Sequence, residues 1–163
     1  MENGWVALLR KRLRELESPY QTINASMSGE TSAGGLRRLP RLLKQYSPKI
    51  VILELGGNDG LRGYPIGQLR KNLASIVTTS VKSGADVLVL PMEIPPNMGR
   101  PYTMAFRQSF TLVAMEHSAN LGRFPLEDVA LNNELMQGDG IHPTKEAQPL
   151  ILETIWLSLE DML

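Results

Sequence analysis

The stretch that decides the fold is KIVILELGGNDG, residues 49–60. The continuous apolar run at 50–53 predicts a strand buried on both faces, as strands of parallel sheets are. Two glycines follow, and Asn58 and Asp59 come directly after them. A buried strand that runs into a polar, glycine-rich loop is typical of the carboxyl edge of a parallel sheet, where ligands bind.

Segments with a helical pattern alternate with strand-like segments along the chain. The apolar spacing predicts helices at 3–17, 32–46, 65–83, 102–119, 126–132 and 144–160, and strands at 20–26, 49–57, 85–92 and 121–126. Such alternation is typical of a parallel sheet covered by helices on both faces. Asn3 is the expected cap of the first helix, and Pro40 interrupts the pattern of the second. The length of 163 residues fits one domain, 1–163.

Composition argues against several classes of protein. The 17 basic residues balance the 17 acidic ones, so nothing in the charge favours nucleic acid as a partner. No apolar run approaches the roughly 18 residues of a transmembrane helix, so we expect no stable insertion into a membrane. The chain has no cysteine and its two histidines fall in no zinc-binding motif, so no metal is expected. The P-loop and dinucleotide-binding motifs are absent, so no cofactor is expected.

The loop LMQGDGIHPT, residues 135–144, carries the first candidate catalytic pair. Asp139 and His142 stand three residues apart, so their side chains can meet across a tight turn. A carboxylate on one ring nitrogen of a histidine fixes the tautomer and leaves the other nitrogen free to act as a general base. The pattern fits equally an aspartate that caps the closing helix, with Pro143 in its first turn, beside a surface histidine. His117, in an ordinary helical segment, is expected to be structural.

Two other loops offer hydrogen-bond donors for an oxyanion. The side-chain amide of Asn58, just past the buried strand, could donate to negative charge that develops on a substrate. The backbone N–H of Gly29, in the loop SMSGETSAGG, could be a second donor. Both patterns also fit plain turns, with Asp59 as a turn or capping residue.

Together these blocks resemble the SGNH, or GDSL-type, hydrolases, and within them the bacterial thioesterase I, arylesterase and lysophospholipase group. The similarity runs from Glu2 to the C-terminus and rests on the ordered blocks ENGW, NASMSGETSAGG, LELGGNDGLRG, PPNMG and DGIHP. The resemblance implies an α/β fold, a flavodoxin-like three-layer α/β/α sandwich with a parallel sheet. It also implies hydrolysis of acyl thioesters, short esters, aryl esters and lysophospholipids without a cofactor.

The resemblance assigns roles to individual residues. It implies that Asp139 and His142 are the acid and base of a Ser-His-Asp triad. It implies that Gly29 and Asn58 form the oxyanion hole. In this scheme the expected substrate is a small-molecule acyl ester or thioester, and the sequence does not define the oligomeric state.

The loop EIPPNMG is expected to border the acyl site. Its residues Pro96, Asn97 and Met98 fall in the PPNMG block, and we predict that they bind the substrate. Met92, Ile94 and Pro95 are expected to line the same crevice, together with Pro96 and Met98.

The nucleophile of the family is the serine of a Gly-Asp-Ser block, which ends the first strand upstream of the ENGW segment. The 163 residues contain neither a Gly-Asp-Ser triplet nor a GxSxG motif. We therefore expect an N-terminally truncated SGNH-hydrolase-like domain without its first strand and catalytic serine. Because the segment 20–26 would lose its neighbour in the sheet, we expect lower stability than in a full-length relative. The serines near Gly29 are not expected to replace the nucleophile.

Three functions stay open on this basis. The first is a serine ester hydrolase fold that acts on acyl esters and thioesters, as an esterase, acyl-CoA thioesterase or lysophospholipase. The second is a non-catalytic module that binds acyl or lipid ligands, or an inactive truncated relic. The third, a phosphate- or nucleotide-binding protein, rests on SGETSAGG alone. Full-length relatives are expected to be periplasmic or secreted, and a chain without an upstream signal peptide to be cytoplasmic.

Overall fold

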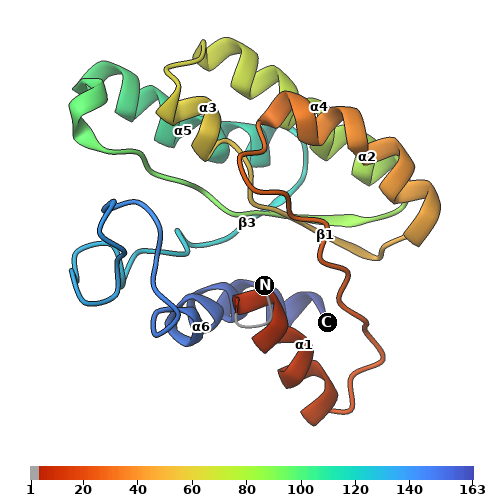
Figure 1. The fold of residues 1–163 in the computed structure, drawn as a ribbon. Helices are drawn as coiled ribbons and strands as arrows, with labels where there is room; N and C mark the ends of the chain where they lie inside the picture. Colours follow the sequence, from red (N-terminus) through yellow and green to blue (C-terminus); the bar gives the residue numbers. More distant parts are fainter. Residues whose placement is uncertain (1–3) are drawn as a thin grey trace. The chain divides into compact units, whose positions relative to one another are not determined.

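The computed structural model describes residues 4–163, which form two compact units (Figure 1). One unit combines Met1–Ala25 with Arg123–Leu163, and the other is Ser26–Gly122. Glu2 of the ENGW block and the expected helix cap Asn3 lie outside the described residues. Over the part that is described, no helix is long and apolar enough to cross a membrane.

The unit Ser26–Gly122 holds the parallel sheet that the sequence predicts. Strand β1 (Ile50–Leu53) pairs with β2 (Asp86–Val89), and β2 pairs with β3 (Asn120–Leu121). Both pairs are parallel, and Val51 lies opposite Val87. Parallel neighbours need a crossover between them, and the long helices that connect these strands supply it.

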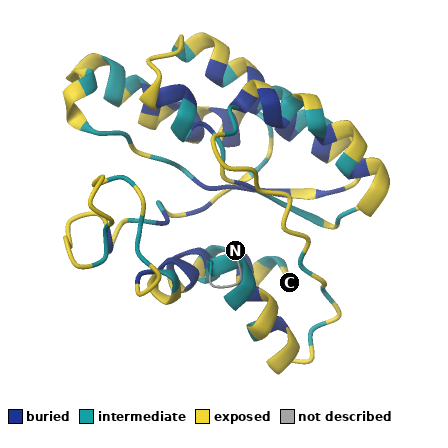
Figure 2. Cartoon of the chain, viewed as in Figure 1, coloured by how far each residue is buried: buried dark blue, intermediate teal, exposed yellow. Residues whose placement is uncertain are grey.

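Three long helices lie on one side of this sheet (Figure 1): α2 (Ser32–Tyr46), α4 (Ile66–Lys82) and α5 (Arg100–Glu116). Helix α4 packs against both α2 and α5. Their apolar faces and the strands enclose one core of buried side chains, dark blue in Figure 2. The fully buried rings of Phe106 and Phe110 meet edge to face there, with centroids 5.3 Å apart. Leu69, Leu73, Ile76 and Val77 of α4 recur at helical spacing and belong to this core, whereas Val81, at the same spacing, is 42% exposed.

The other unit pairs α1 (Trp5–Glu15) with α6 (Gln148–Leu159). Arg12 of α1 forms an ion pair with Glu153 of α6. The same guanidinium lies 4.9 Å from the centre of the Trp156 ring. This cation–π contact and the ion pair join the two helices, although both are partly solvated.

The prediction of a strand at 20–26 is wrong. The structure describes these residues and assigns no strand to them, and the three-stranded sheet does not include them. Tyrosine, threonine and isoleucine favour an extended backbone, but a strand also needs a neighbour that completes its ladder of hydrogen bonds. One carbonyl of this segment, that of Thr22, accepts a hydrogen bond from the Arg10 side chain instead.

The strand expected at 121–126 is shorter than predicted, and the helix expected at 126–132 does not form. The strand is limited to Asn120–Leu121. A series of turns takes the place of the helix, held by bonds such as the one from Ala130 N–H to the Leu126 carbonyl at 2.8 Å. A few residues contain too little of a period to separate a helix from turns.

The closing helix begins later than its predicted start at 144. Helix α6 begins at Gln148, with Ala147 as its N-cap, and a 3-10 turn, Glu160–Met162, follows it. Pro143 and Asp139 therefore do not belong to its first turn, and the helix-capping alternative for Asp139 is wrong. Pro149, a few residues after Pro143, is the proline that occupies the first turn of α6.

Candidate active site

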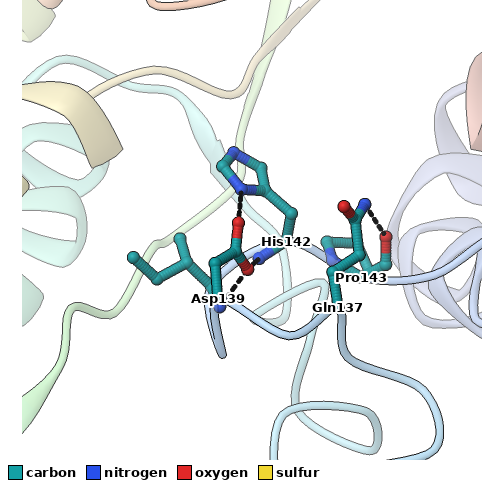
Figure 3. Close-up of polar contacts among 5 residues, drawn as sticks. Gln137, Asp139, His142 and Pro143 are labelled. Carbon is teal, nitrogen blue, oxygen red and sulfur yellow. Dashed lines mark hydrogen bonds and ion pairs between the residues drawn. The ribbon is translucent and has the colours of Figure 1, made fainter.

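The structure forms the predicted Asp139–His142 pair (Figure 3). Nδ1 of His142 lies 2.7 Å from Oδ2 of Asp139. The other carboxylate oxygen, Oδ1, accepts the backbone N–H groups of Ile141 and His142 at 2.9 and 3.0 Å. The carboxylate is therefore held on both oxygens and faces the imidazole in one orientation.

Backbone hydrogen bonds close the loop that carries this pair. Met136 and Pro143 form an antiparallel bridge, and the N–H of Gln137 donates to the His142 carbonyl at 2.8 Å. The Gln137 side chain also donates to the Pro143 carbonyl at 3.0 Å (Figure 3). Inside the loop Gly140 has φ +64°, a left-handed conformation that glycine adopts without strain. The glycine in DGIHP thus permits the turn that brings acid and base together.

Hydrogen bonding lowers the pKa of Asp139 well below its ordinary value. The backbone N–H of His142 contributes most, followed by the His142 ring and the backbone N–H of Ile141. The carboxylate is therefore ionised at neutral pH, where it can only accept hydrogen bonds. It selects the His142 tautomer with the proton on Nδ1 and the lone pair on Nε2. The His142 side chain is 67% exposed, so a reacting group can reach that nitrogen.

The carboxyl end of β1 forms a second group of candidate residues, in the unit Ser26–Gly122. Gly56 has φ +121°, and a Cβ there would lie 3.1 Å from Leu69 and 3.2 Å from Phe110. Glycine suits that turn, because the positive φ would strain any other residue and the space for a Cβ is tight. A short helix, α3 (Gly57–Leu61), follows where the sequence predicts a loop, and it carries the half-buried Asn58.

Gly29 lies in an exposed turn just before α2. Its φ is +72°, and no atom lies within 4 Å of the position that a Cβ would take. The backbone conformation, and not packing, therefore favours glycine here. Its carbonyl accepts a hydrogen bond from the Arg62 side chain at 3.4 Å, which links the turn to the residue that ends α3.

Asp59 joins these two segments, a contact that sequence analysis missed. Its side chain is buried, with 3% exposure. Oδ2 accepts the backbone N–H of Ser32 at 2.8 Å, and Oδ1 accepts the Ser32 hydroxyl at 2.5 Å. The Ser32 oxygen also accepts a hydrogen bond from Asn72 of α4 at 2.9 Å. Ser32 is therefore a buried structural serine. Asp59, which belongs to α3, caps the N-terminal end of α2.

Apolar side chains pack the loop that follows β2 against α3. The Met92 methyl group lies 2.9 Å from the position that a Cβ would take on Gly57. A methyl group of Ile94 lies 2.7 Å from the corresponding position on Gly60. These glycines allow the close approach, so the two apolar side chains contact α3.

Pro96, Asn97 and Met98, the predicted substrate-binding residues, form a 3-10 turn, η1 (Pro96–Met98). Pro96 and Asn97 are exposed, whereas Met98 is half-buried. The Met98 methyl group lies 3.5 Å from the Cβ position of Gly63, just beyond α3. Their role in binding stays a prediction.

The structural role expected of His117 and the expected absence of a metal stay predictions. Nδ1 of His117 lies 3.4 Å from the Thr78 hydroxyl, in a long contact between α4 and the end of α5. Among residues 4–163 no group of three or more histidine, aspartate or glutamate side chains could hold a metal ion.

Comparison with known proteins identifies the family. A model described as the GDSL-like Lipase/Acylhydrolase family matches residues 1–149. The chain belongs to this family. The esterase TesA of Pseudomonas aeruginosa is 49% identical over 160 residues, which cover 98% of this chain and 80% of that protein. The thioesterase 1/protease 1/lysophospholipase L1 of Escherichia coli K12 is 41% identical over 155 residues, or 95% of this chain and 72% of that protein.

Comparison with solved structures shows that this GDSL-like hydrolase has the fold of known esterases. The psychrotrophic esterase EstA from Pseudoalteromonas sp. superposes with a TM-score of 0.94 at 44% identity, covering 98% of this chain and 87% of that one. The α/β fold of the SGNH hydrolases and membership of their esterase family, both expected from the sequence blocks, are confirmed. The roles of Asp139, His142, Gly29 and Asn58 stay predictions.

Proposed function

We propose that the chain carries the acid–base pair and the oxyanion donors of a serine ester hydrolase that acts on small acyl esters and thioesters. The observation that carries the proposal is the 2.7 Å contact between His142 Nδ1 and Asp139 Oδ2, with the carboxylate held by two backbone N–H groups. The names of the relatives, an esterase and a thioesterase/lysophospholipase, support this class of substrate.

In the proposed reaction His142 is first a base and then an acid. Nε2 takes the proton of a serine hydroxyl as the serine oxygen attacks the acyl carbon. Asp139 keeps the Nδ1 proton in place and stabilises the imidazolium. His142 then protonates the leaving alcohol or thiol. In the second half of the reaction His142 takes a proton from water, which attacks the acyl carbon of the acyl-enzyme, and His142 returns that proton to the serine oxygen as it leaves. Asn58 and the backbone N–H of Gly29 would donate to the oxyanion of each tetrahedral intermediate.

The serine in this scheme is that of the Gly-Asp-Ser block that the family resemblance implies and that the 163 residues do not contain. The test therefore supplies the block. In a chimera, the segment of a family relative that carries Gly-Asp-Ser would precede Met1, and the 163-residue chain would be the matched control without it. We expect the chimera to hydrolyse p-nitrophenyl butyrate and an acyl-CoA. His142→Ala in the chimera should lower kcat by about 10⁴-fold or more.

Two outcomes would count against the proposal. A folded chimera that binds an acyl ligand but hydrolyses no ester would favour the binding module instead. A His142→Ala chimera with unchanged kcat would remove His142 from the reaction. Fluorophosphonate labelling, mapped by mass spectrometry, identifies the nucleophile in parallel. A serine labelled within the 163-residue chain in a His142-dependent manner would assign the nucleophile to these residues.

A further inference from the structure

We propose that Asp59 is a positioning residue that fixes the two oxyanion donors, Gly29 and Asn58, relative to each other. The inference rests on the proposed function, because it assigns a purpose to a carboxylate beside a proposed donor. Asp59 follows Asn58 directly in α3, and its bonding partner Ser32 stands three residues after Gly29. One side chain thus connects the segments that carry both donors.

The burial of this carboxylate requires an explanation. A buried charge is costly unless hydrogen bonds and opposite charge compensate for it. In the part of the chain that the structure describes, no ion pair involves Asp59. Both of its oxygens bind Ser32, the first residue of the 15-residue helix α2, where the helix dipole contributes partial positive charge. The end of α2 therefore compensates the charge and ties its own position to α3.

The contact extends into a third helix. Asn72 of α4 donates to the Ser32 hydroxyl at 2.9 Å and accepts a hydrogen bond from Gln68 at 2.8 Å. Because the Ser32 hydroxyl uses both its proton and a lone pair, a shift of α2 relative to α3 or α4 would break at least one buried bond. The cost of such a break is high in a buried site, so the network holds the three helices in register.

The benefit for catalysis is geometric. An oxyanion hole works when its donors lie about 2.7–3.1 Å from the developing charge. A negative charge next to Asn58 would by itself oppose an oxyanion, so an electrostatic role for Asp59 would slow the reaction. Asp59 therefore speeds the reaction only if the rate gained from well-placed donors exceeds the rate lost to repulsion between its charge and the oxyanion.

The test compares two network variants with a matched control. Asp59→Asn removes the charge and one acceptor, and Ser32→Ala removes the hydroxyl but keeps the carboxylate. Ser109→Ala is the control, because Ser109 is also fully buried and also accepts one bond and donates one. Its hydroxyl accepts from Arg70 at 2.9 Å and donates to the Ala105 carbonyl at 2.7 Å, away from the donor segments.

Two readouts separate positioning from stability. In the chimera, Asp59→Asn and Ser32→Ala should each lower kcat at least tenfold with KM within twofold, whereas Ser109→Ala should change neither by more than twofold. In ¹H–¹⁵N spectra of the 163-residue chain, the backbone amide of Gly29 and the side-chain amide of Asn58 should shift in the first two variants and not in the control.

Several results would overturn the inference. They are an unchanged kcat in both network variants, an increase of kcat in Asp59→Asn, or an equal loss of kcat in Ser109→Ala. The inference would also fail if the amide resonances of Gly29 and Asn58 stayed unchanged in both network variants. If the unmodified chimera hydrolyses nothing, the proposed function fails, and the spectra still decide whether Asp59 positions the two donors.

Discussion

Replacement of Asp139 by asparagine should reverse the tautomer of His142. Oδ1 of Asp139 accepts two backbone N–H groups at 2.9 and 3.0 Å, while Oδ2 accepts the Nδ1 proton at 2.7 Å. A carboxamide has one acceptor oxygen and one donor nitrogen. The oxygen must stay with the two backbone donors, because an NH2 group would oppose both of them. The NH2 group then faces Nδ1 and donates to it, so the ring proton moves to Nε2.

The expected effect on turnover is large. With its proton on Nε2, the imidazole cannot accept a proton there, although the loop keeps its geometry. The same rearrangement in a serine-protease triad lowers kcat about 10⁴-fold. The Asp139 and His142 side chains are 45% and 67% exposed, so water competes for both and allows some rings to keep the active tautomer. We therefore expect kcat of the chimera to fall by about 10² to 10⁴-fold.

The tautomer can be measured without turnover. In ¹⁵N spectra of the imidazole-labelled 163-residue chain, at a pH where the ring is neutral, Nε2 of His142 should change from a pyridine-type to a pyrrole-type resonance in Asp139→Asn. His117, the second histidine, lies 3.4 Å from the Thr78 hydroxyl and should keep its signals. A pyridine-type Nε2 in the variant, or a kcat within threefold of the parent chimera, would refute the assignment of Asp139 as the residue that orients His142.

Three further perturbations test the packing and the electrostatics. Gly60→Ala should destabilise the protein by about 1–3 kcal/mol in urea unfolding, because its Cβ would lie 2.7 Å from an Ile94 methyl group and 2.7 Å from the fully buried Phe106 ring. Gly67→Ala is the matched control, with nothing within 4 Å of its Cβ, and equal losses in both would contradict the steric argument. Phe110→Ala should lower the free energy of unfolding by about 3–5 kcal/mol, since the ring is fully buried, and a loss below about 1 kcal/mol would place Phe110 outside the core. The Asp139 pKa is lowered on folding, so its stabilising contribution is present above the unfolded-state pKa near 3.9 and is lost as pH falls through the lower folded-state pKa. A ¹³C titration of this carboxyl with a midpoint at or above the ordinary value would exclude that contribution.

Local patterns predicted much of the fold because their signals lie within a few residues. The apolar run at 50–53 is β1 (Ile50–Leu53), and the helix predicted at 32–46 is α2. The periodicity of α2 survives Pro40 because that residue lies on the exposed face of the helix, where water can satisfy the carbonyl that loses its partner. The contact of Asp139 with His142 was predictable for the same reason, since both residues lie in one tight turn.

Other features depend on partners that lie far away in the sequence. The extended segment 20–26 has the composition of a strand, but strand formation depends on a neighbour, which local composition does not encode. Asp59 is an ordinary acidic residue in a glycine-rich stretch until its bond to Ser32, 27 residues away, is known. Its short helix α3 was likewise missed, because α3 has too few residues for a periodic signal.

The sequence by itself therefore determined the alternating α/β class, the family through its ordered blocks, and the contact between Asp139 and His142 on one loop. Only the tertiary structure decided that both carboxylate oxygens of Asp59 bind Ser32, the first residue of α2. These bonds connect the segment of the candidate donor Asn58 with the segment of the candidate donor Gly29. The tertiary structure also decided that Met92 and Ile94 pack against the glycines of α3. The physical reason is that periodic burial and tight turns depend on residues that are close together in the sequence. A buried hydrogen bond or a close packing contact instead depends on where the folded chain brings distant residues together.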